Sequence, residues 1–256
     1  MEYILSRASR AILARLALNR TLCAFDFDGT LSPIVEHPAQ ASMRDRTRIL
    51  LDRLAALYPC VVISGRSRAD LLGRLGSVKL ASVIGNHGAE TEATSRKPDR
   101  RIEQRKASLE LHLGALPGLW VEDKGLCLAV HYRQSPQKSE ARRRILATTR
   151  NLDQVRVLRG KQVVNLVVAS APDKGEALVD ERDRLGCNWV LYTGDDATDE
   201  DAFAMDGHVV PVRIGRKQRS HARYYLRTQA EIDKLLELLV LRRAPVRPHP
   251  SISQAK

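Results

Sequence analysis

The sequence predicts an α/β fold, a doubly wound, Rossmann-like parallel sheet into which a smaller α+β domain is inserted. Short apolar runs alternate with helix-like stretches over the first 95 residues and again from residue 172. These runs are hydrophobic on both faces, as strands buried in a parallel sheet are. Between residues 96 and 171 the pattern instead indicates two helices and four strands.

The elements expected in the large sheet follow from these apolar runs. Strands are predicted at 22–25, 60–63, 82–84, 189–192 and 208–212, and helices at 43–57, 67–76, 174–185 and 199–205. Before the first strand, Ile4, Leu5, Ala8, Ile12 and Leu16 recur at helical spacing. The Arg-rich residues 1–20 are therefore expected to form a surface helix rather than a targeting segment.

The inserted segment is bounded by polar, Pro-bearing stretches at 95–99 and 170–173, which resemble hinges between domains. We expect a core made of residues 1–95 and 172–242, an inserted domain at 96–171, and a flexible tail at 243–256. Within the insertion, helices are predicted at 99–114 and 137–150, and strands at 119–123, 126–132, 154–158 and 162–168.

Composition excludes some classes of protein. No stretch approaches the roughly 20 consecutive apolar residues of a membrane-spanning helix, so no membrane association is expected. The four cysteines are far apart and lie in or beside apolar runs, without the spacing of a zinc site or a disulfide framework. They are expected to be reduced core residues of a cytoplasmic protein.

The net charge of +12 raises the alternative of a nucleic-acid-binding protein. Residues 96–171 contain sixteen Lys or Arg and seven Asp or Glu, including the run at 142–144. These basic residues lack the interleaved aromatic residues that stack on bases, so they are interpreted as solvated helix faces and no nucleic-acid partner is expected. A basic lid would also attract a phosphorylated substrate.

Two carboxylates follow the first predicted core strand. Asp26 and Asp28 come directly after the run 22–25, at the strand end where a parallel sheet carries its chemistry. Gly29 permits the sharp turn by which the chain leaves the strand after these two carboxylates. Taken alone, the pattern is also that of an ordinary strand end.

Three more segments place polar residues at strand or helix ends. They are Ser64-Gly65-Arg66 after the run 60–63, Lys174 at the start of a predicted helix, and the acidic segment 195–201 after the run 189–192. Crowded carboxylates raise one another's pKa unless a cation or a helix N-terminus takes up the charge. A divalent metal is the simplest partner for them.

The order of these four motifs resembles that of the haloacid dehalogenase superfamily of phosphotransferases. Several segments further resemble trehalose-6-phosphate phosphatases, and together they span about residues 21–206. They are Asp26–Pro33, Ser64–Arg66, Gly85–Glu90, Val121–Lys124, His131–Arg133 and Gly194–Asp201. The resemblance implies hydrolysis of trehalose 6-phosphate, with the insertion acting as a cap over the substrate.

The resemblance also implies catalytic roles. Asp26 is the candidate nucleophile that forms an aspartyl-phosphate, and Asp28 the candidate general acid and base. Ser64 and Lys174 are expected to donate to the phosphate oxygens. Mg²⁺ is expected to be bound by Asp26, Asp195 and the main-chain carbonyl of Asp28. For Asp196 and Asp199 two roles remain open, which are orienting Lys174 and capping a helix.

Substrate-binding residues are implied mainly in the cap. The candidates are Arg66, His87, Glu122, Lys124, Arg133, Lys161 and Asn165. His87 and Arg66 have structural alternatives, since His87 lies in a Gly-flanked turn and Arg66 could brace the Asp cluster. Asn165 departs from the family, which usually has glutamate there. An amide still binds a hydroxyl but offers no negative acceptor, so another sugar phosphate is the nearest alternative substrate. The sequence does not indicate an oligomeric state.

Overall fold

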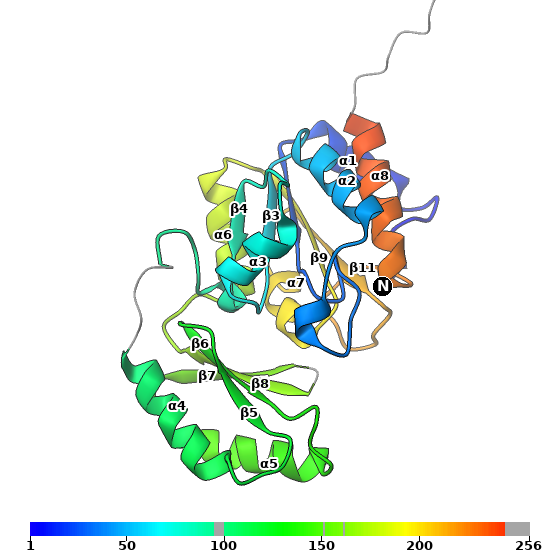
Figure 1. Ribbon diagram of the computed structural model, residues 1–256. Coiled ribbons are helices and arrows are strands. Elements are labelled where there is room, and N and C mark those ends of the chain that lie inside the picture. The colour runs from blue at the N-terminus through cyan, green and yellow to red at the C-terminus, as the bar shows by residue number, and fades with distance from the viewer. Residues whose placement is uncertain (95–99, 151, 161, 244–256) are drawn as a thin grey trace, which may run out of the picture.

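Two sheets organise the molecule, which we describe from a computed structural model of residues 1–256. The structure describes all residues except 95–99, 151, 161 and 244–256, so one expected hinge and the expected tail from residue 244 lie outside the described residues, while Arg243 is the last residue of a helix. A seven-stranded parallel sheet, here called the core sheet, and a four-stranded antiparallel sheet, the cap sheet, lie one above the other (Figure 1). None of the described helices is long and apolar enough to cross a membrane.

The core sheet has the order β1-β11-β10-β9-β2-β3-β4, and the neighbouring strands within it are all parallel. Its strands are β1 (Glu2–Tyr3), β2 (Thr21–Phe25), β3 (Cys60–Ile63), β4 (Ser82–Ile84), β9 (Trp189–Gly194), β10 (Val209–Ile214) and β11 (Tyr224–Leu226). The central strands β2 and β3 are buried along their whole length. This explains why they read as continuous apolar runs rather than as alternating ones.

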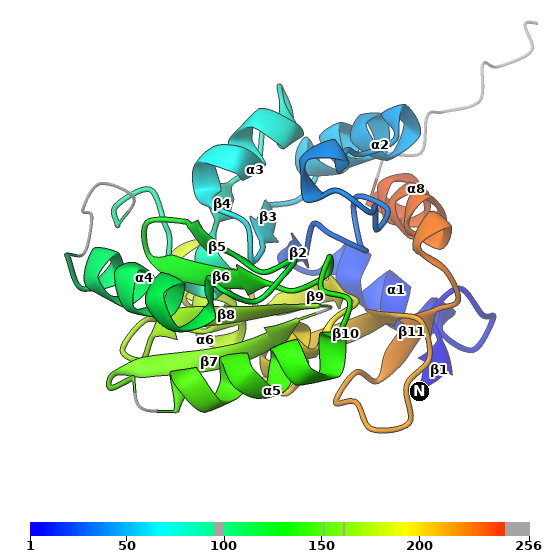
Figure 2. The same cartoon turned by 60° about the horizontal axis from the view of Figure 1, so that its bottom comes forward.

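Helices cover both faces of the core sheet (Figure 2). One face carries α1 (Arg10–Leu18), α2 (Asp45–Ala55), α3 (Arg68–Leu75) and α8 (Ile232–Arg243), and the other carries α6 (Lys174–Arg184) and α7 (Glu200–Phe203). Alternate residues of β2 divide between the two hydrophobic clusters, because Cys23 and Phe25 pack with the first layer and Leu22 and Ala24 with the second. Short 3₁₀ turns occupy Pro38–Gln40, Asn86–Gly88, Ala197–Asp199 and Gln229–Glu231.

The cap sheet has the order β5-β6-β8-β7. Its elements are α4 (Arg100–Leu113), β5 (Trp120–Asp123), β6 (Cys127–His131), α5 (Lys138–Thr149), β7 (Val155–Gly160) and β8 (Val163–Val168). Leu128, Val130, Val164 and Leu166 pack with both helices on one face. The alternating residues, including Ala129 and Asn165, therefore face the other way, toward the core.

The sequence-based elements differ from the structure mainly at the chain ends. The expected opening helix begins only at Arg10, because Glu2 and Tyr3 form an edge strand that pairs with Tyr224 and Tyr225. Strand β11 and helix α8 were not predicted. A two- or three-residue strand is too short for periodicity to show, and its pairing partner lies far away in the sequence. The expected helix 199–205 is shorter, since a 3₁₀ turn precedes the four-residue α7.

Candidate active site

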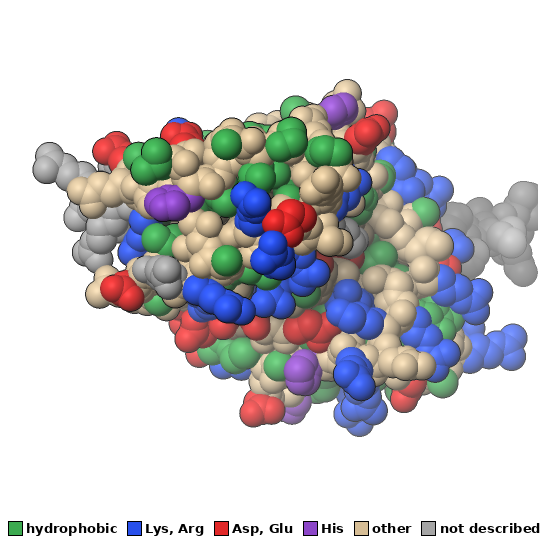
Figure 3. Space-filling model, turned by 90° about the horizontal axis from the view of Figure 1, so that it is seen from below, with side chains coloured by type: hydrophobic (Ala, Val, Ile, Leu, Met, Phe, Trp, Pro, Cys, Tyr) green, Lys and Arg blue, Asp and Glu red, His purple; other side chains and the backbone are tan. Residues whose placement is uncertain are grey.

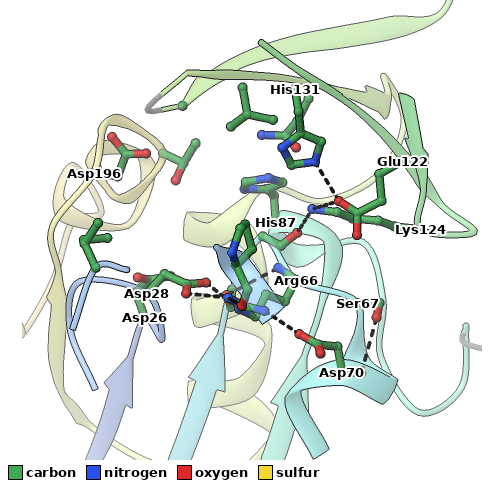
Figure 4. A pocket seen from close by; sticks show the side chains of 18 of the residues that line it. Asp26, Asp28, Arg66, Ser67, Asp70, His87, Glu122, Lys124, His131 and Asp196 are labelled. Atoms are coloured by element: carbon green, nitrogen blue, oxygen red, sulfur yellow. Dashed lines mark hydrogen bonds and ion pairs between the residues drawn. The ribbon is translucent and has the colours of Figure 1, made fainter. Parts of the chain in front are cut away.

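The carboxyl ends of β2, β3 and β9 meet at one edge of the core sheet. Phe25 is in register with Val62 on one side and with Thr193 on the other. Asp26, Ser64 and Asp195 follow these positions by one or two residues, so they lie side by side although they are far apart in the sequence. They line one cavity between the core and the cap sheet (Figure 4).

Lys174 lies at the centre of the buried charges. Its Nζ is 2.8 Å from Oδ1 of Asp26 and 2.7 Å from Oδ1 of Asp199, and all three side chains are almost fully buried. Asp173 caps the helix that carries Lys174 by accepting hydrogen bonds from Gly175 and Glu176. Burial works against the ammonium, but the carboxylates of Asp199 and Asp26 hold the pKa of Lys174 well above its usual value.

The carboxylate of Asp199 accepts four hydrogen bonds. Its Oδ1 accepts from Lys174 and from the hydroxyl of Tyr192, and its Oδ2 accepts from the backbone N–H groups of Asp195 and Asp196. A side chain at Gly194 would collide with Asp199, since a Cβ there would lie 2.2 Å from its carboxyl carbon. Asp199 thus both orients Lys174 and takes part in the capping box with Asp196, so the two interpretations left open by the sequence hold together.

Burial raises the pKa of Asp26 well above the usual range for aspartate. The carboxylates of Asp199 and Asp195 act in the same direction, and Lys174 only partly offsets them. Three carboxylates share one ammonium in this cluster. Excess negative charge in a buried site favours either protonation or the binding of a cation.

The oxygen atoms at this edge suit a hard divalent cation. Carboxylate oxygens of Asp26, Asp195 and Asp199 lie within 4.8 Å of one another. Because Asp199 already accepts four hydrogen bonds, Asp26 and Asp195 are the carboxylates better placed to bind metal. A Cβ at Gly29 would lie 2.3 Å from Oδ2 of Asp195, so glycine leaves room for that carboxylate. The donor set is all oxygen, as Mg²⁺ requires.

Arg66 holds Asp28 through a two-point ion pair. Its Nε is 2.6 Å from Oδ2 of Asp28 and its Nη2 is 2.7 Å from Oδ1. Nη1 contacts Asp70 on α3 at 2.7 Å, and Nη2 also donates to the carbonyl of Pro38. Four of the five guanidinium donors are thus engaged by protein. Of the two roles considered for Arg66, these contacts favour bracing the acidic residues.

A strained turn links the carboxylate-lined end of the cavity to the cap. Asn86 and His87 both adopt left-handed φ angles, 50° and 61°, which cost on the order of 1 kcal/mol each. Hydrogen bonds from the two backbone N–H groups to Arg66 and Ser64 offset that cost. The Asn86 side chain donates to Glu90 and to the Lys124 carbonyl in the cap. The turn therefore fixes the cap strand β5 to the core.

His87 and Asn165 carry buried polar atoms toward the cavity. Among the described residues, neither ring nitrogen of His87 nor Oδ1 of Asn165 has a well-formed hydrogen bond, although the two side chains are neighbours. Burial lowers the pKa of His87 well below its usual value, as do the charges of Lys174 and Lys124. The ring is therefore neutral at pH 7. Unpaired polar atoms in a buried wall favour a polar ligand there.

Other cap residues contact the core or one another. Lys124 donates to the carbonyl of Gly65, and Arg133 donates to the carbonyls of Val35 and Glu36, each at about 3 Å. Burial opposes the charge of Glu122, but His131 and Lys124 hold its pKa below the usual value. Lys161, also expected at the substrate, lies outside the described residues.

Comparison with known proteins identifies the family. The sequence profile described as trehalose-phosphatase matches residues 24–226, most of the chain. The chain belongs to the trehalose-phosphatase family. It is 31% identical to the rice (Oryza sativa) protein "Probable trehalose-phosphate phosphatase 9", and the match covers 89% of this chain and 72% of that protein. It is 34% identical to "Trehalose-phosphate phosphatase" of Mycobacterium tuberculosis, covering 87% of this chain and 62% of the relative.

Solved structures agree with this trehalose-phosphatase assignment. The Aspergillus fumigatus trehalose-6-phosphate phosphatase in crystal form 3 is 27% identical, with a TM-score of 0.62 over 94% of this chain and 99% of that chain. The C-terminal domain of the Candida albicans trehalose-6-phosphate phosphatase shares the fold, with a TM-score of 0.76 at 24% identity over 90% and 96% of the two chains. A phosphatase of the haloacid dehalogenase superfamily, BT1666 from Bacteroides thetaiotaomicron, also shares the fold, with a TM-score of 0.61 at 17% identity over 86% and 94% of the two chains.

In this trehalose-phosphatase family member, one cavity gathers the described residues that the sequence singled out. They are Asp26, Asp28, Ser64, Arg66, His87, Glu122, Lys124, Arg133, Asn165, Lys174 and Asp195. Asp70, Ile34, Val35 and His131 also line the cavity, although the sequence analysis assigned no role to them. His131 begins the segment His131–Arg133 that carries the family resemblance, but only its contact with Glu122, and that of Asp70 with Arg66, gives these two residues a role.

Proposed function

We propose that this chain is a Mg²⁺-dependent phosphatase that hydrolyses trehalose 6-phosphate to trehalose and inorganic phosphate. The observation that carries the proposal is that one cavity joins the Asp26–Lys174–Asp195 cluster to a polar wall of the cap sheet. Such a cavity can bind a phosphate at one end and a polyhydroxylated group at the other. Family membership supports the same reaction.

The proposed reaction assigns a task to each core residue. Asp26 attacks the phosphorus and carries the phosphoryl group as an aspartyl-phosphate, which a water molecule then hydrolyses. Asp28 protonates the departing sugar oxygen and afterwards accepts a proton from that water. Lys174 and Ser64 stabilise the charge on the phosphate oxygens. Mg²⁺ bound by Asp26, Asp195 and the Asp28 carbonyl would supply further positive charge there.

The contacts between cap and core suit a reaction that excludes water. Lys124, Arg133 and Asn86 each contribute hydrogen bonds between the two parts. These contacts hold the cap over the cavity, and we propose that the cap moves to admit a disaccharide phosphate. Exclusion of water from the cavity by the cap would also strengthen the interactions of charged groups with the phosphate.

A panel of phosphate esters tests the proposal directly. Phosphate release would be compared for trehalose 6-phosphate, sucrose 6-phosphate, glucose 6-phosphate and p-nitrophenyl phosphate in the presence of Mg²⁺. We expect the highest kcat/KM for trehalose 6-phosphate. If a different sugar phosphate is preferred by about tenfold or more, the substrate assignment fails while the phosphatase mechanism stands.

Another sugar phosphate is the second candidate, and Asn165 is the observation that favours it. Asn165 faces the cavity from β8, across Ala129 from Glu122 on β5. Glutamate at this position would add a negative acceptor beside Lys124 and His87. Its replacement by an amide changes which pattern of hydroxyl groups is bound best.

Nucleic-acid binding has less support. Figure 3 shows the Lys and Arg side chains of one face with Asp and Glu side chains among them. In the exposed run 142–144 of α5, Arg143 and Arg144 both bond to Glu140. We therefore propose no nucleic-acid partner. The four buried free cysteines support a reducing, cytoplasmic environment.

Replacing Asp28 with asparagine should slow both steps of the reaction. The amide cannot protonate the leaving sugar or accept a proton from water, and we expect kcat to fall by roughly 100-fold or more. If the second step suffers more, phosphorylated protein accumulates and intact-mass spectrometry detects it. Finding the phosphate on a residue other than Asp26 would contradict the scheme. Asp52→Asn, at an exposed carboxylate on α2, is the matched control.

Asn165→Glu should keep or increase the preference for trehalose 6-phosphate. The new carboxylate would lie beside His87 and within the field of Lys124, so its burial would be partly compensated. We expect the kcat/KM ratio of trehalose 6-phosphate to glucose 6-phosphate to stay the same or rise. Asn165→Gln, which is as long but uncharged, controls for size. A fall in the ratio for Glu but not Gln would show that the site rejects an acid there.

A further inference from the structure

Two aromatic rings stack at the cap end of the cavity. Trp120 on β5 and His131 on β6 are directly opposite in the antiparallel register, with ring centroids 4.0 Å apart and planes 9° apart. Of the two rings, only His131 lines the cavity. Figure 4 shows it projecting from the cap strand into the space above His87. Because Trp120 covers one face of the imidazole, the face that a ligand in the cavity can cover is the other one.

The imidazole is also held at its edge. Nε2 of His131 lies 2.8 Å from Oε2 of Glu122, and Glu122 lies 3.7 Å from Nζ of Lys124. Since Glu122 is ionised at neutral pH, Nε2 donates the hydrogen bond. A ring fixed by stacking on one face and by a hydrogen bond at its edge loses little entropy when a ligand covers its other face.

The surroundings of this face suit one ring of a sugar. Ile34, which is 50% exposed, and Val163 supply apolar surface, while Glu122 and Asn165 supply hydrogen-bonding groups. A pyranose has the same division, with apolar C–H faces and hydroxyl groups around its edge. Ala129 lies between Glu122 and Asn165 in the cap sheet, and its small side chain leaves space over this part of the wall.

We infer that His131, backed by Trp120, is a stacking platform for the sugar ring that does not carry the phosphate. The inference deepens the proposed function and rests on it, because it assigns a subsite to the second ring of a disaccharide phosphate. The core motifs contact only the phosphate end, so a platform of this kind distinguishes two-ring from one-ring substrates. Glu122 then has two tasks, since it binds sugar hydroxyls and orients the ring.

A second Trp–His pair provides an internal control. Trp189 and His208 also stack, with centroids 4.5 Å apart and planes 9° apart. They lie at the start of β9 and just before β10, at the end of the core sheet opposite Asp195. Stacking as such is therefore compatible with a purely structural role. What distinguishes the Trp120–His131 pair is that its imidazole faces the cavity.

Fluorescence can test the platform without catalysis, because Trp120 and Trp189 are the two tryptophans of the chain. Trp189→Phe leaves Trp120 as the reporter, and Trp120→Phe leaves Trp189. Each variant would be titrated with trehalose. We expect a saturable change in emission only when Trp120 is the reporter, at concentrations that also inhibit phosphate release. If wild type hydrolyses trehalose 6-phosphate and the emission of Trp120 does not respond, the inference is overturned.

Two substitutions of His131 separate stacking from hydrogen bonding. His131→Phe keeps a flat ring and loses the bond to Glu122, whereas His131→Gln keeps a donor and loses the ring. We expect Gln to lower the kcat/KM ratio of trehalose 6-phosphate to glucose 6-phosphate by roughly five- to tenfold, and Phe to change it by less than about threefold. Equal losses in the two variants would overturn the platform. Absence of hydrolysis of any sugar phosphate by wild type would instead refute the proposed function.

Discussion

Asp26→Asn is expected to give a folded protein that releases no measurable phosphate from any sugar phosphate. The amide keeps the shape of the carboxylate, but it is a very poor nucleophile and a weaker metal ligand. Phosphate release at saturating Mg²⁺ and substrate is the measurement. A turnover within about tenfold of wild type, a barrier difference of only ~1.4 kcal/mol, would remove Asp26 as the nucleophile.

The same substitution should not weaken the fold in the absence of metal. Asp26, Asp195 and Asp199 are three buried, neighbouring carboxylates, two of which form ion pairs with the ammonium of Lys174. Removing one charge lessens the repulsion among the others, and Lys174 keeps Asp199 as an ion-pair partner. Thermal unfolding of the metal-free variant should therefore occur at a temperature no lower than that of wild type. A large fall in that temperature would show that Asp26 is mainly a structural partner of Lys174.

The sequence predicts the central strands of the core sheet well because their burial produces continuous apolar runs. Residues 22–25 and 60–63 are apolar at every position, since each strand is buried on both faces. The same reasoning fails for Glu2–Tyr3 and Tyr224–Leu226. These strands are defined by pairing with each other at the sheet edge, and two or three residues carry no periodic signal.

The meeting of polar residues at the carboxyl edge of the core sheet could be predicted for a related reason. Parallel strands bring their carboxyl ends to one edge, so Asp26, Ser64 and Asp195 meet wherever their strands are neighbours. The electrostatic roles could not be predicted in the same way. The four hydrogen bonds that Asp199 accepts and the two-point ion pair between Arg66 and Asp28 depend on side-chain directions. Spacing in the sequence does not specify these directions.

The cap residues that line the cavity were harder to predict from the sequence, for a physical reason. Glu122 and Lys124 look like the exposed positions of an alternating strand, and only their family resemblance singled them out. His131 gains its place from antiparallel pairing, which puts it opposite Trp120 and within reach of Glu122. Pairing of this kind depends on strand register, and register is a property of the folded sheet.

Removal of divalent metal should abolish activity, and added Mg²⁺ should restore it. The available ligands at the carboxyl edge are oxygens, and without a cation the pKa of Asp26 is raised by burial and by its acidic neighbours. A protonated Asp26 is not a nucleophile. Dialysis against EDTA followed by phosphate-release assays with and without Mg²⁺ is the measurement. Full activity after exhaustive dialysis would exclude the metal from the mechanism.

Mg²⁺ should also stabilise the folded chain, which gives a readout that does not depend on turnover. A ligand at 100 times its Kd that binds only the folded state contributes about 2.7 kcal/mol. Protons compete with the cation for Asp26, so the stabilisation should weaken as pH falls below its raised pKa. The Mg²⁺-induced stabilisation increases with pH because metal binds the carboxylate form of Asp26, and that form predominates only above its raised pKa.

Asp195 and Asp196 offer a matched pair for locating the metal. Both precede the same short 3₁₀ turn, but Asp195 lies against Gly29 next to Asp26, whereas Asp196 takes part in the capping box with Asp199. Asparagine preserves the cap at position 196. We therefore expect Asp195→Asn to lose the Mg²⁺-dependent rise in unfolding temperature, and Asp196→Asn to retain it. The reverse result would place the cation on Asp196, away from the proposed nucleophile Asp26. The raised pKa of Asp26 would then have no bound cation beside it to lower it.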